Sequence, residues 1–337
     1  MKKIFNLIVS FVLLAGFSAC NKDGSDKPGL PPAPVPTVNY KGLTFISSGN
    51  STVCLAKVGA PDEITLEYST DESQWNPYTL GEKISLADGT FLLFRAGEQK
   101  NLTFSKGSDS YYHFEISGPV TAQGNIMSLL DRDFSTPLST NAFFALFEGC
   151  KSLLSAPELP ATTMAQGCYF RMFAECTGLT SAPELPAEAL AYNCYGRMFK
   201  GCSALTYVPD LPATKMEAYC YNSMFANCTS LKFAPELPAT RLDTGCYHCM
   251  FEGCTSLTSA PELPATELVS NCYEFMYKDC RNLRYVIGLF TTEPSKKTTE
   301  DWLSGVAASG TFIKSEKATW DVTGAHGVPE GWKIETW

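Results

Sequence analysis

Histidine and basic residues are scarce in this sequence. Its 337 residues include three histidines, and 26 Lys and Arg against 35 Asp and Glu, for a net charge of −9. A nucleic-acid partner is therefore disfavoured, because phosphate binding requires a basic surface. The three histidines lie far apart, and the sequence contains no HExxH, no GxSxG and no glycine-rich phosphate loop. We therefore expect a protein that is not an enzyme and uses no metal or other cofactor.

Long apolar runs are few as well. The longest, residues 4–17, follows two lysines and precedes Ser18-Ala19-Cys20, which predicts an export signal over residues 1–20. Residues 17–20 resemble a bacterial lipobox, which implies that Cys20 receives lipid. A plain secretory signal cleaved nearby is the alternative.

Residues 21–38 hold five prolines in eighteen positions. This composition stays extended and does not pack, so it predicts a linker. With lipid on Cys20, the chain would meet a membrane only through this anchor. We therefore expect a location in the cell envelope, as an outer-membrane lipoprotein exposed on the surface.

Residues 39–122 alternate apolar and polar side chains, as at Ile64, Leu66 and Tyr68. This period of two is typical of half-buried strands. Six or seven short strands separated by turns predict a small all-β sandwich. We interpret it as a spacer, with a carbohydrate-binding or adhesive role as the alternative.

Residues 123–290 repeat one unit every 26 residues. Each unit carries a cysteine followed three residues later by a leucine. A short unit of constant length buries its apolar face only by stacking on its neighbours, so the repeats predict a solenoid with one continuous core. The cysteines at this position are Cys150, Cys176, Cys202, Cys228, Cys254 and Cys280.

Within one unit, Cys194, Met198 and Cys202 are four residues apart, as on one face of a short helix. Leu205 and Val208 follow in a short extended piece that prolines end. These features predict an α/β repeat solenoid with a short strand and a short helix per repeat.

Residues 291–337 lack the repeat signature and hold four of the five tryptophans. Residues Thr298 to Asp301 indicate the start of a helix. Because an open solenoid end invites aggregation, we interpret this segment as a cap over the core, with a tryptophan sugar platform as the alternative.

Eleven of the fourteen cysteines form two ladders, with members eight residues apart within a repeat. Eight residues of helix span about 12 Å, beyond the roughly 4.4–6.8 Å between the Cα atoms of a disulfide. We therefore interpret them as small buried side chains.

A zinc site at Cys246, Cys249, Cys254 and His248 is disfavoured, because two of these cysteines belong to the ladders. A column of turn acids, one per repeat, is interpreted as solvated and accepting local backbone bonds rather than binding calcium.

The unit C-Y-x-x-M-F-x-x-C-x-x-L-x-x-x-P-x-L-P-A, as in Cys220 to Ala239, resembles the leucine-rich repeats of BspA-like surface lipoproteins of gut and oral anaerobes. Phe173, Cys176 and Leu179 match the A-F-x-x-C-x-x-L core of that family, with Met172 in place of Ala. The repeats are longer than the roughly 23 residues common in the family. The resemblance implies a non-enzymatic surface protein that binds or adheres to a partner, and it carries over no catalytic residue.

Two sets of outward residues are candidate binding positions. The second residue after the ladder leucine is aromatic at Tyr207, Phe233 and Tyr285, and strand alternation should turn it outward. Partial burial against the next turn is the alternative. Arg171 and Arg197 belong to a variable column on the expected helical side, where a solvated face is the alternative.

Two functions fit this pattern. The first is an adhesion or binding module for host or matrix proteins, acting through the solenoid surface. The alternative is a glycan-binding lipoprotein of a nutrient-capture system.

Overall fold

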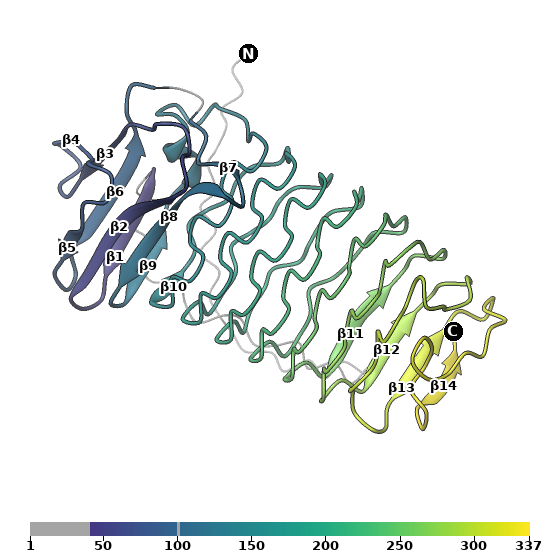
Figure 1. The fold of residues 1–337 in the computed structure, drawn as a ribbon. Coiled ribbons are helices and arrows are strands. Elements are labelled where there is room, and N and C mark those ends of the chain that lie inside the picture. Colours follow the sequence, from purple (N-terminus) through teal and green to yellow (C-terminus); the bar gives the residue numbers. More distant parts are fainter. Residues whose placement is uncertain (1–40, 100–101) are drawn as a thin grey trace, which may run out of the picture. The chain divides into compact units, whose positions relative to one another are not determined.

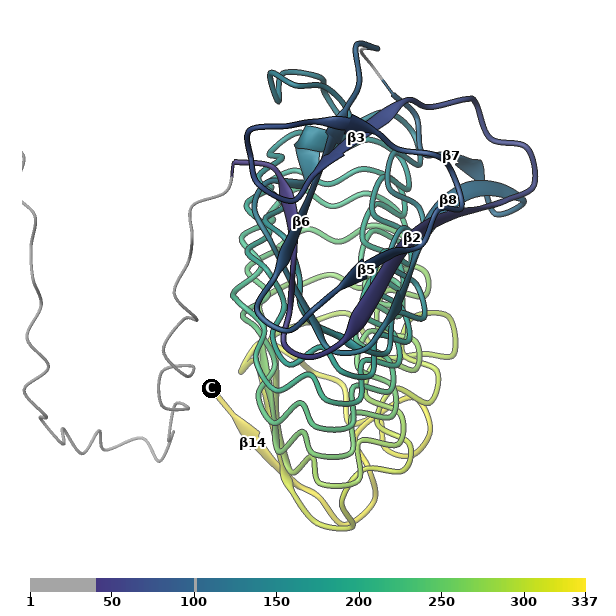
Figure 2. The ribbon, with the colours of Figure 1, turned by 90° about the vertical axis from the view of Figure 1, so that its left-hand side faces the viewer.

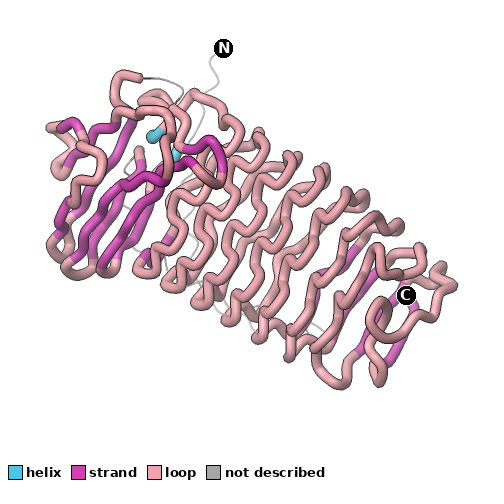
Figure 3. The backbone as a smooth tube through the Cα atoms, in the orientation of Figure 1, coloured by secondary structure: helices cyan, strands magenta, loops and turns pink. Residues whose placement is uncertain are grey.

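The computed structural model describes residues 41–99 and 102–337. The predicted signal peptide, its lipid-attachment residue Cys20 and the predicted linker lie outside these residues. The described chain has a single helix, the short 3-10 turn η1 (Ile126–Leu129), and none of its helices is long and apolar enough to cross a membrane. Strands, turns and loops make up the rest (Figure 3).

The N-terminal strands form two sheets. Their orders are β10-β9-β1-β6-β3-β4 and β5-β2-β8-β7, and every pairing is antiparallel except that of β9 with β10. The strands are β1 (Leu43–Ser47), β2 (Ser51–Val58), β3 (Leu66–Ser69), β4 (Asn76–Pro77), β5 (Ile84–Leu86), β6 (Phe91–Ala96), β7 (Ser105–Gly107), β8 (Ser110–Ser117), β9 (Val120–Gln123) and β10 (Leu153–Ser155).

These two sheets face each other through aromatic side chains. The ring of Phe45 on β1 lies edge-on to that of Phe114 on β8, with 5.0 Å between centroids, and Phe94 on β6 lies 5.6 Å from the same ring. Phe114 also stacks on Phe147 at 5.2 Å. Strand β9 pairs in parallel with β10, so the N-terminal sheet leads directly into the repeats (Figure 1). The buried side chains of the sheets and the repeats form one cluster.

The repeats wind as successive coils of 26 residues, stacked behind the N-terminal strands in Figure 2. The N–H of Tyr169 donates to the carbonyl of Cys194 in the next coil at 3.0 Å, and Phe173 donates likewise to Met198 at 2.9 Å. Residues between these bond within their own coil, as the Met172 N–H does to the Tyr169 carbonyl at 3.2 Å. No coil satisfies its backbone alone, which confirms the predicted solenoid.

The helix expected in each repeat is not formed, and this prediction was wrong. In residues 123–290, all of which are described, the segment between the two ladder cysteines is a run of tight turns. Every fourth residue has a positive φ, as at Gly167 (59°), Arg171 (57°) and Glu175 (60°), which no right-handed helix allows. Four-residue turns return to one face every four residues. Over nine residues this period is hard to tell from the 3.6 of a helix.

The coils continue beyond residue 290 in a parallel sheet of order β11-β12-β13-β14. Thr298 to Asp301, expected to start a helix, instead lie in turns and loop. The Thr298 carbonyl accepts a bond from the Tyr273 N–H of the preceding coil at 3.0 Å. The strands are β11 (Ser259–Leu263), β12 (Tyr285–Gly288), β13 (Thr311–Lys314) and β14 (Lys333–Thr336).

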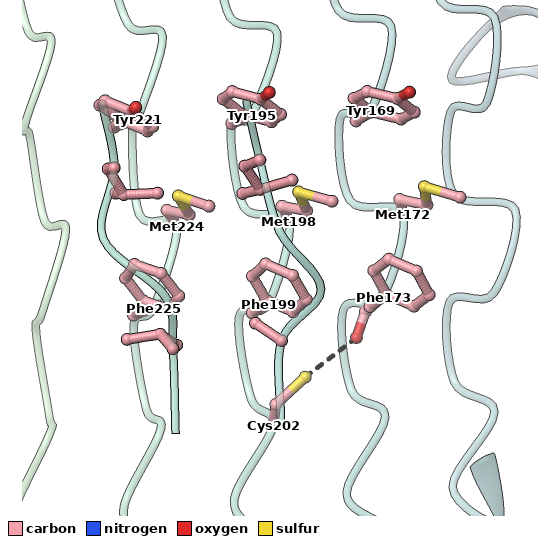
Figure 4. Packing of buried hydrophobic residues seen from close by; sticks show 14 of the residues in the cluster. Tyr169, Met172, Phe173, Tyr195, Met198, Phe199, Cys202, Tyr221, Met224 and Phe225 are labelled. Atoms are coloured by element: carbon pink, nitrogen blue, oxygen red, sulfur yellow. Dashed lines mark hydrogen bonds between the residues drawn. The ribbon is translucent and has the colours of Figure 1, made fainter. Parts of the chain in front are cut away.

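Aromatic rings stack inside the coils in two columns (Figure 4). In the first, Phe173 lies 5.3 Å from Phe147 and 5.5 Å from Phe199, with interplanar angles of 2° and 3°. In the second, Tyr195 lies 5.9 Å from its counterpart in the preceding coil and 5.7 Å from the next. Since each coil repeats the one before it, most rings of the two columns stack on an identical ring of the next coil.

The ladder cysteines are buried free thiols, and the described cysteines form no disulfide. Cys202 donates its S–H to the carbonyl oxygen of Phe173 in the preceding coil at 3.1 Å (Figure 4). Five ladder cysteines make this contact with the preceding coil at 3.0–3.2 Å, and Cys150 makes the equivalent contact with Phe114 on β8 at 3.0 Å. The thiol therefore serves both as a small packing group and as a weak donor to a buried carbonyl.

The tail tryptophans mostly close the core. Trp302, Trp320 and Trp332 are buried, and each indole N–H donates to a backbone carbonyl at 2.8–3.2 Å. Trp302 stacks on Tyr273 at 6.2 Å and so ends the tyrosine column. These three rings have no face left for a sugar, whereas Trp337 is 66% exposed.

Candidate functional site

The turn segment of each coil carries two side-chain columns on the outer side of the backbone. They lie between the inward tyrosine and methionine columns, which keep the same residue in nearly every coil, whereas the outer columns change. Variable side chains that point outward from a constant backbone are typical of binding sites. The first outer column is Phe144, Phe170, Gly196, Asn222, His248 and Glu274, and the second is Ala145, Arg171, Arg197, Ser223, Cys249 and Phe275.

At Gly196 the first outer column lacks a side chain, and the Phe170 ring and the Asn193 amide occupy that position. A Cβ atom on Gly196 would lie 2.8 Å from Cδ2 of Phe170 and 2.1 Å from Oδ1 of Asn193, so even alanine would force side chains to move. Beside the glycine is an open hollow of about 320 Å³ that spans three coils. It is lined by Phe170, Tyr192, Asn193, Arg197, Tyr219 and Asn222, which we call the Gly196 hollow.

Aromatic rings form much of its wall. Phe170 stacks on Phe144 of the preceding coil at 5.5 Å, and its ring lies against Gly196 of the next coil. Tyr192 and Tyr219 meet edge-on at 6.2 Å, and Tyr192 is 46% exposed. The hollow therefore has aromatic side chains in its wall, and Tyr192 at its rim is open to solvent.

Arg197 adds a positive charge at the hollow. Its Cζ atom lies 5.9 Å from the Phe170 ring centroid, and the side chain is exposed. Within the described residues it makes no ion pair, whereas Arg171, one coil earlier in the same column, pairs with Glu148. Of these two predicted residues, only Arg197 keeps a guanidinium available for an added anion.

His248 adjoins the hollow from the following coil. Its Nδ1 lies 2.8 Å from Nδ2 of Asn222, and its Nε2 lies 3.5 Å from Oε2 of Glu274 and 3.9 Å from Sγ of Cys249. Burial lowers the pKa of His248. Burial, helped by the Glu252 carboxylate, raises the pKa of Cys249 to about 12. The Cys249 thiol is therefore protonated at neutral pH, which disfavours it as a nucleophile. The hydrogen bond between Asn222 and His248 holds the Asn222 amide at the hollow.

The predicted aromatic column of Tyr207, Phe233 and Tyr285 lies away from the Gly196 hollow. Tyr207 and Tyr285 are 37% and 39% exposed, and Phe233 is half-buried. Across the described chain no ring contact joins these three, and none of them lines the Gly196 hollow. Tyr207 bridges to Ser181 and Phe233 to Ser259, so serines interrupt the column.

Acidic side chains follow the proline-marked turns along one edge. The Asp210 carboxylate accepts a bond from the backbone N–H of Glu236 in the next coil at 3.3 Å, which is a bond between coils and not the local bond that the sequence predicted. In the part of the chain that the structure describes, no three His, Cys, Asp or Glu side chains are grouped to hold a metal ion. Cys246 and Cys254, considered for zinc, are fully buried in the core.

Sequence reasoning selected Arg197 but missed the hollow beside it. The available signal was Gly196, a missing side chain in a column with large residues on either side, but a helical reading places that column differently. No family model matches the chain, and neither a curated protein nor a solved structure is similar enough to count as a match.

Proposed function

We propose that this protein is a non-enzymatic binding module, tethered to the cell envelope by a lipid on Cys20, that holds its partner at the outer columns of the turn segments. The Gly196 hollow is the observation that carries the proposal. It combines aromatic rings, amides and a guanidinium that the described residues leave unpaired, a mixture typical of ligand sites. The resemblance of the repeats to BspA-like leucine-rich-repeat surface lipoproteins supports the same function.

The stacked interior suits this role. Backbone bonds between coils hold neighbouring outer side chains at a constant spacing of roughly 4.8 Å. A partner therefore meets side chains that are already ordered, which lowers the entropic cost of binding. Host or matrix proteins fit such a row of coils as partners.

A glycan-binding lipoprotein of a nutrient-capture system is the second candidate, and the size of the hollow favours it. A stable protein interface buries roughly 800 Å² on each partner and would extend well beyond this site. One or two sugar rings would fill a hollow of about 320 Å³. The two candidates thus share the site and differ in how far contacts spread from it.

A binding panel tests the proposal. The full chain is measured against soluble glycans and against host and matrix proteins, beside a rim variant, Tyr192→Ser/Tyr219→Ser, and a strand-side variant, Tyr207→Ser/Phe233→Ser/Tyr285→Ser. We expect the rim variant to weaken binding at least tenfold, about 1.4 kcal/mol, and the strand-side variant to bind like wild type. Loss of binding in the strand-side variant alone would refute the site. A wild-type chain that binds no panel member, or that turns its ligand over, would refute the binding module.

A further inference from the structure

Two tyrosines meet at the Gly196 hollow, at positions where the other coils carry small or polar residues. Tyr192 and Tyr219 lie edge-on at 6.2 Å, and each is the only aromatic side chain in its column. Two departures from the repeat therefore coincide at one place on the surface. The column of Tyr192 otherwise holds Thr140, Gln166, Ala218, Thr244 and Ser270, and that of Tyr219 holds Asn141, Gly167, Asn193, Gly245 and Asn271.

The backbone at Tyr219 is in the left-handed region. All six residues of its column have a positive φ of 54–59°, and the other five are glycine or asparagine, which adopt this conformation most readily. Large residues also occur at positive φ in the second outer column, as at Arg171 and Arg197, so Tyr219 is unusual within its own column. Its side chain is half-buried, so burial offsets little of the strain. Strained residues concentrate at ligand sites, which points to a function for this ring.

Packing fixes the orientation of the Tyr219 ring. A Cβ atom on Gly245 of the next coil would lie 2.4 Å from Cε1 of Tyr219, so the ring rests on that glycine. Tyr192 of the preceding coil meets it edge-on and is itself 46% exposed. Phe170 is less suited to hold a ligand, because its ring stacks on another phenylalanine and lies 5.9 Å from Cζ of Arg197. The tyrosine pair is therefore the open stacking surface of the hollow.

The polar groups beside the tyrosines suit the hydroxyls of a sugar. Among the described residues, the Asn193 amide has no hydrogen bond and the Arg197 guanidinium has no ion pair, and no acidic residue lines the hollow. Planar amide and guanidinium groups can bond two neighbouring hydroxyls at once. The face of a tyrosine ring carries negative potential and attracts the polarised C–H groups of a sugar ring. A pyranose therefore matches both the rings and the polar groups of this site.

We propose that Tyr192 and Tyr219 form a stacking platform that binds one sugar ring of a glycan, with its hydroxyls on Asn193 and Arg197. This inference rests on the glycan-binding form of the proposed function and specifies the residues that contact the sugar. Tyr219 is then a residue whose backbone strain is tolerated because its ring serves the ligand. Since the hollow is open, the glycan can continue from the platform into solvent.

Neutral tetrasaccharides test this assignment on the full chain. Wild type is titrated by calorimetry with cellotetraose, β-1,4-mannotetraose, maltotetraose and chitotetraose. We expect wild type to bind at least one of them, and Tyr192→Ser and Tyr219→Asn each to weaken that binding at least tenfold. Tyr219→Phe keeps the ring and should bind within about threefold of wild type.

Urea unfolding of the same variants gives a second measurement. Tyr219→Asn should raise the urea midpoint, because asparagine tolerates the positive φ that strains a large side chain. Tyr285→Asn is the matched control, since Tyr285 is also exposed but has no positive φ and lies outside the hollow. It should neither raise the midpoint nor change the affinity.

Each alternative outcome has a separate meaning. Unchanged affinity in Tyr192→Ser and Tyr219→Asn would overturn the platform, and a lower midpoint in Tyr219→Asn would show that the tyrosine stabilises the fold. A hexaproline peptide that binds as tightly as the best tetrasaccharide would overturn the sugar assignment, because proline-rich peptides also dock on aromatic side chains. Binding of a panel protein with no binding of any tetrasaccharide would overturn this inference while the binding module stands. Binding of nothing would overturn both.

Discussion

Aromatic rings pack differently in the N-terminal sheets and in the coils. Phe45, Phe94 and Phe114 meet one another edge-on, with interplanar angles of 61–79°. Phe173 and Phe199 are parallel within 3°. Ring quadrupoles allow both edge-on and offset stacked pairs, and an irregular chain can adopt either at each contact. A repeat copies each buried ring onto the next coil in the same orientation, so the rings of the two inner columns lie parallel.

Buried tyrosine hydroxyls show the same contrast. In the sheets, the Tyr78 hydroxyl accepts a bond from the Leu55 N–H at 2.8 Å and donates to the Glu82 carbonyl at 2.7 Å. In the coils, the hydroxyls of Tyr195 and Tyr277 are buried and have no partner among the described residues. Repetition therefore provides many equal apolar contacts but few individual polar partners. A distinct site arises where the repetition stops, as at Gly196.

The largest difference between the two regions should appear at high pH. Of the thirteen described cysteines, only Cys54 lies in the sheets and the other twelve lie in the coils. Burial raises the pKa of Cys150 and of Cys254 to about 12. Near neutral pH both the folded and unfolded states keep these protons, so stability is unaffected. Above about pH 8.5 the unfolded chain loses protons that the folded coils retain, and stability falls by about 1.4 kcal/mol per thiol for each pH unit.

Urea unfolding at pH 7, 9 and 10 checks this expectation, with hydrogen exchange to locate the opening. The midpoint should collapse between pH 9 and 10, and amides of the coils should exchange before those of β1 (Leu43–Ser47) and β6 (Phe91–Ala96). A midpoint that stays constant to pH 10 would contradict the buried thiols.

The equivalence of the coils makes a second prediction. Replacing Phe173, Phe199 or Phe225 by alanine removes a ring from nearly identical surroundings, and each change should cost about 3–5 kcal/mol. The three values should agree, whereas alanine replacements of the sheet rings should differ from one another because their neighbours differ. Arg197→Gln, at an exposed position two residues before Phe199, is the control and should change stability by less than about 0.5 kcal/mol. If the losses in unfolding free energy vary as widely among the three coil variants as among the sheet variants, the coils are not equivalent.

Much of the fold follows from period alone. The 26-residue interval predicts stacked coils, and Cys202 and Leu205 are buried as their constant spacing indicates. The prediction of a helix in each repeat was wrong because a spacing of four residues suits both a helix and a run of turns. The distinguishing signal is Gly or Asn at turn positions with positive φ, as at Gly201 (77°), Asn227 (62°) and Gly253 (71°), where side chains are strained unless they are small or locally bonded.

The candidate site was harder to predict for a physical reason. Arg197 was selectable because a charged residue in a variable column is exposed in either fold. The hollow is lined by residues of three successive coils, among them Phe170, Asn193 and Asn222. Those three residues become neighbours only when the direction of the outer column is known, and that direction depends on turns rather than helix.

The smallest prediction concerns the one break in the phenylalanine column. Tyr277 occupies the position held by phenylalanine in the preceding coils, stacks on Phe251 at 5.6 Å and buries a hydroxyl with no partner among the described residues. Tyr277→Phe should therefore raise the free energy of unfolding by about 1 kcal/mol, because a desolvated hydroxyl is removed and the ring contact stays. The same change at Tyr78 should lower it by about 1–3 kcal/mol, because the Leu55 N–H and the Glu82 carbonyl lose their partner. Urea unfolding of both variants measures the two changes in the free energy of unfolding. Changes of equal sign would mean that the buried tyrosine hydroxyls of the coils are as well bonded as those of the sheets.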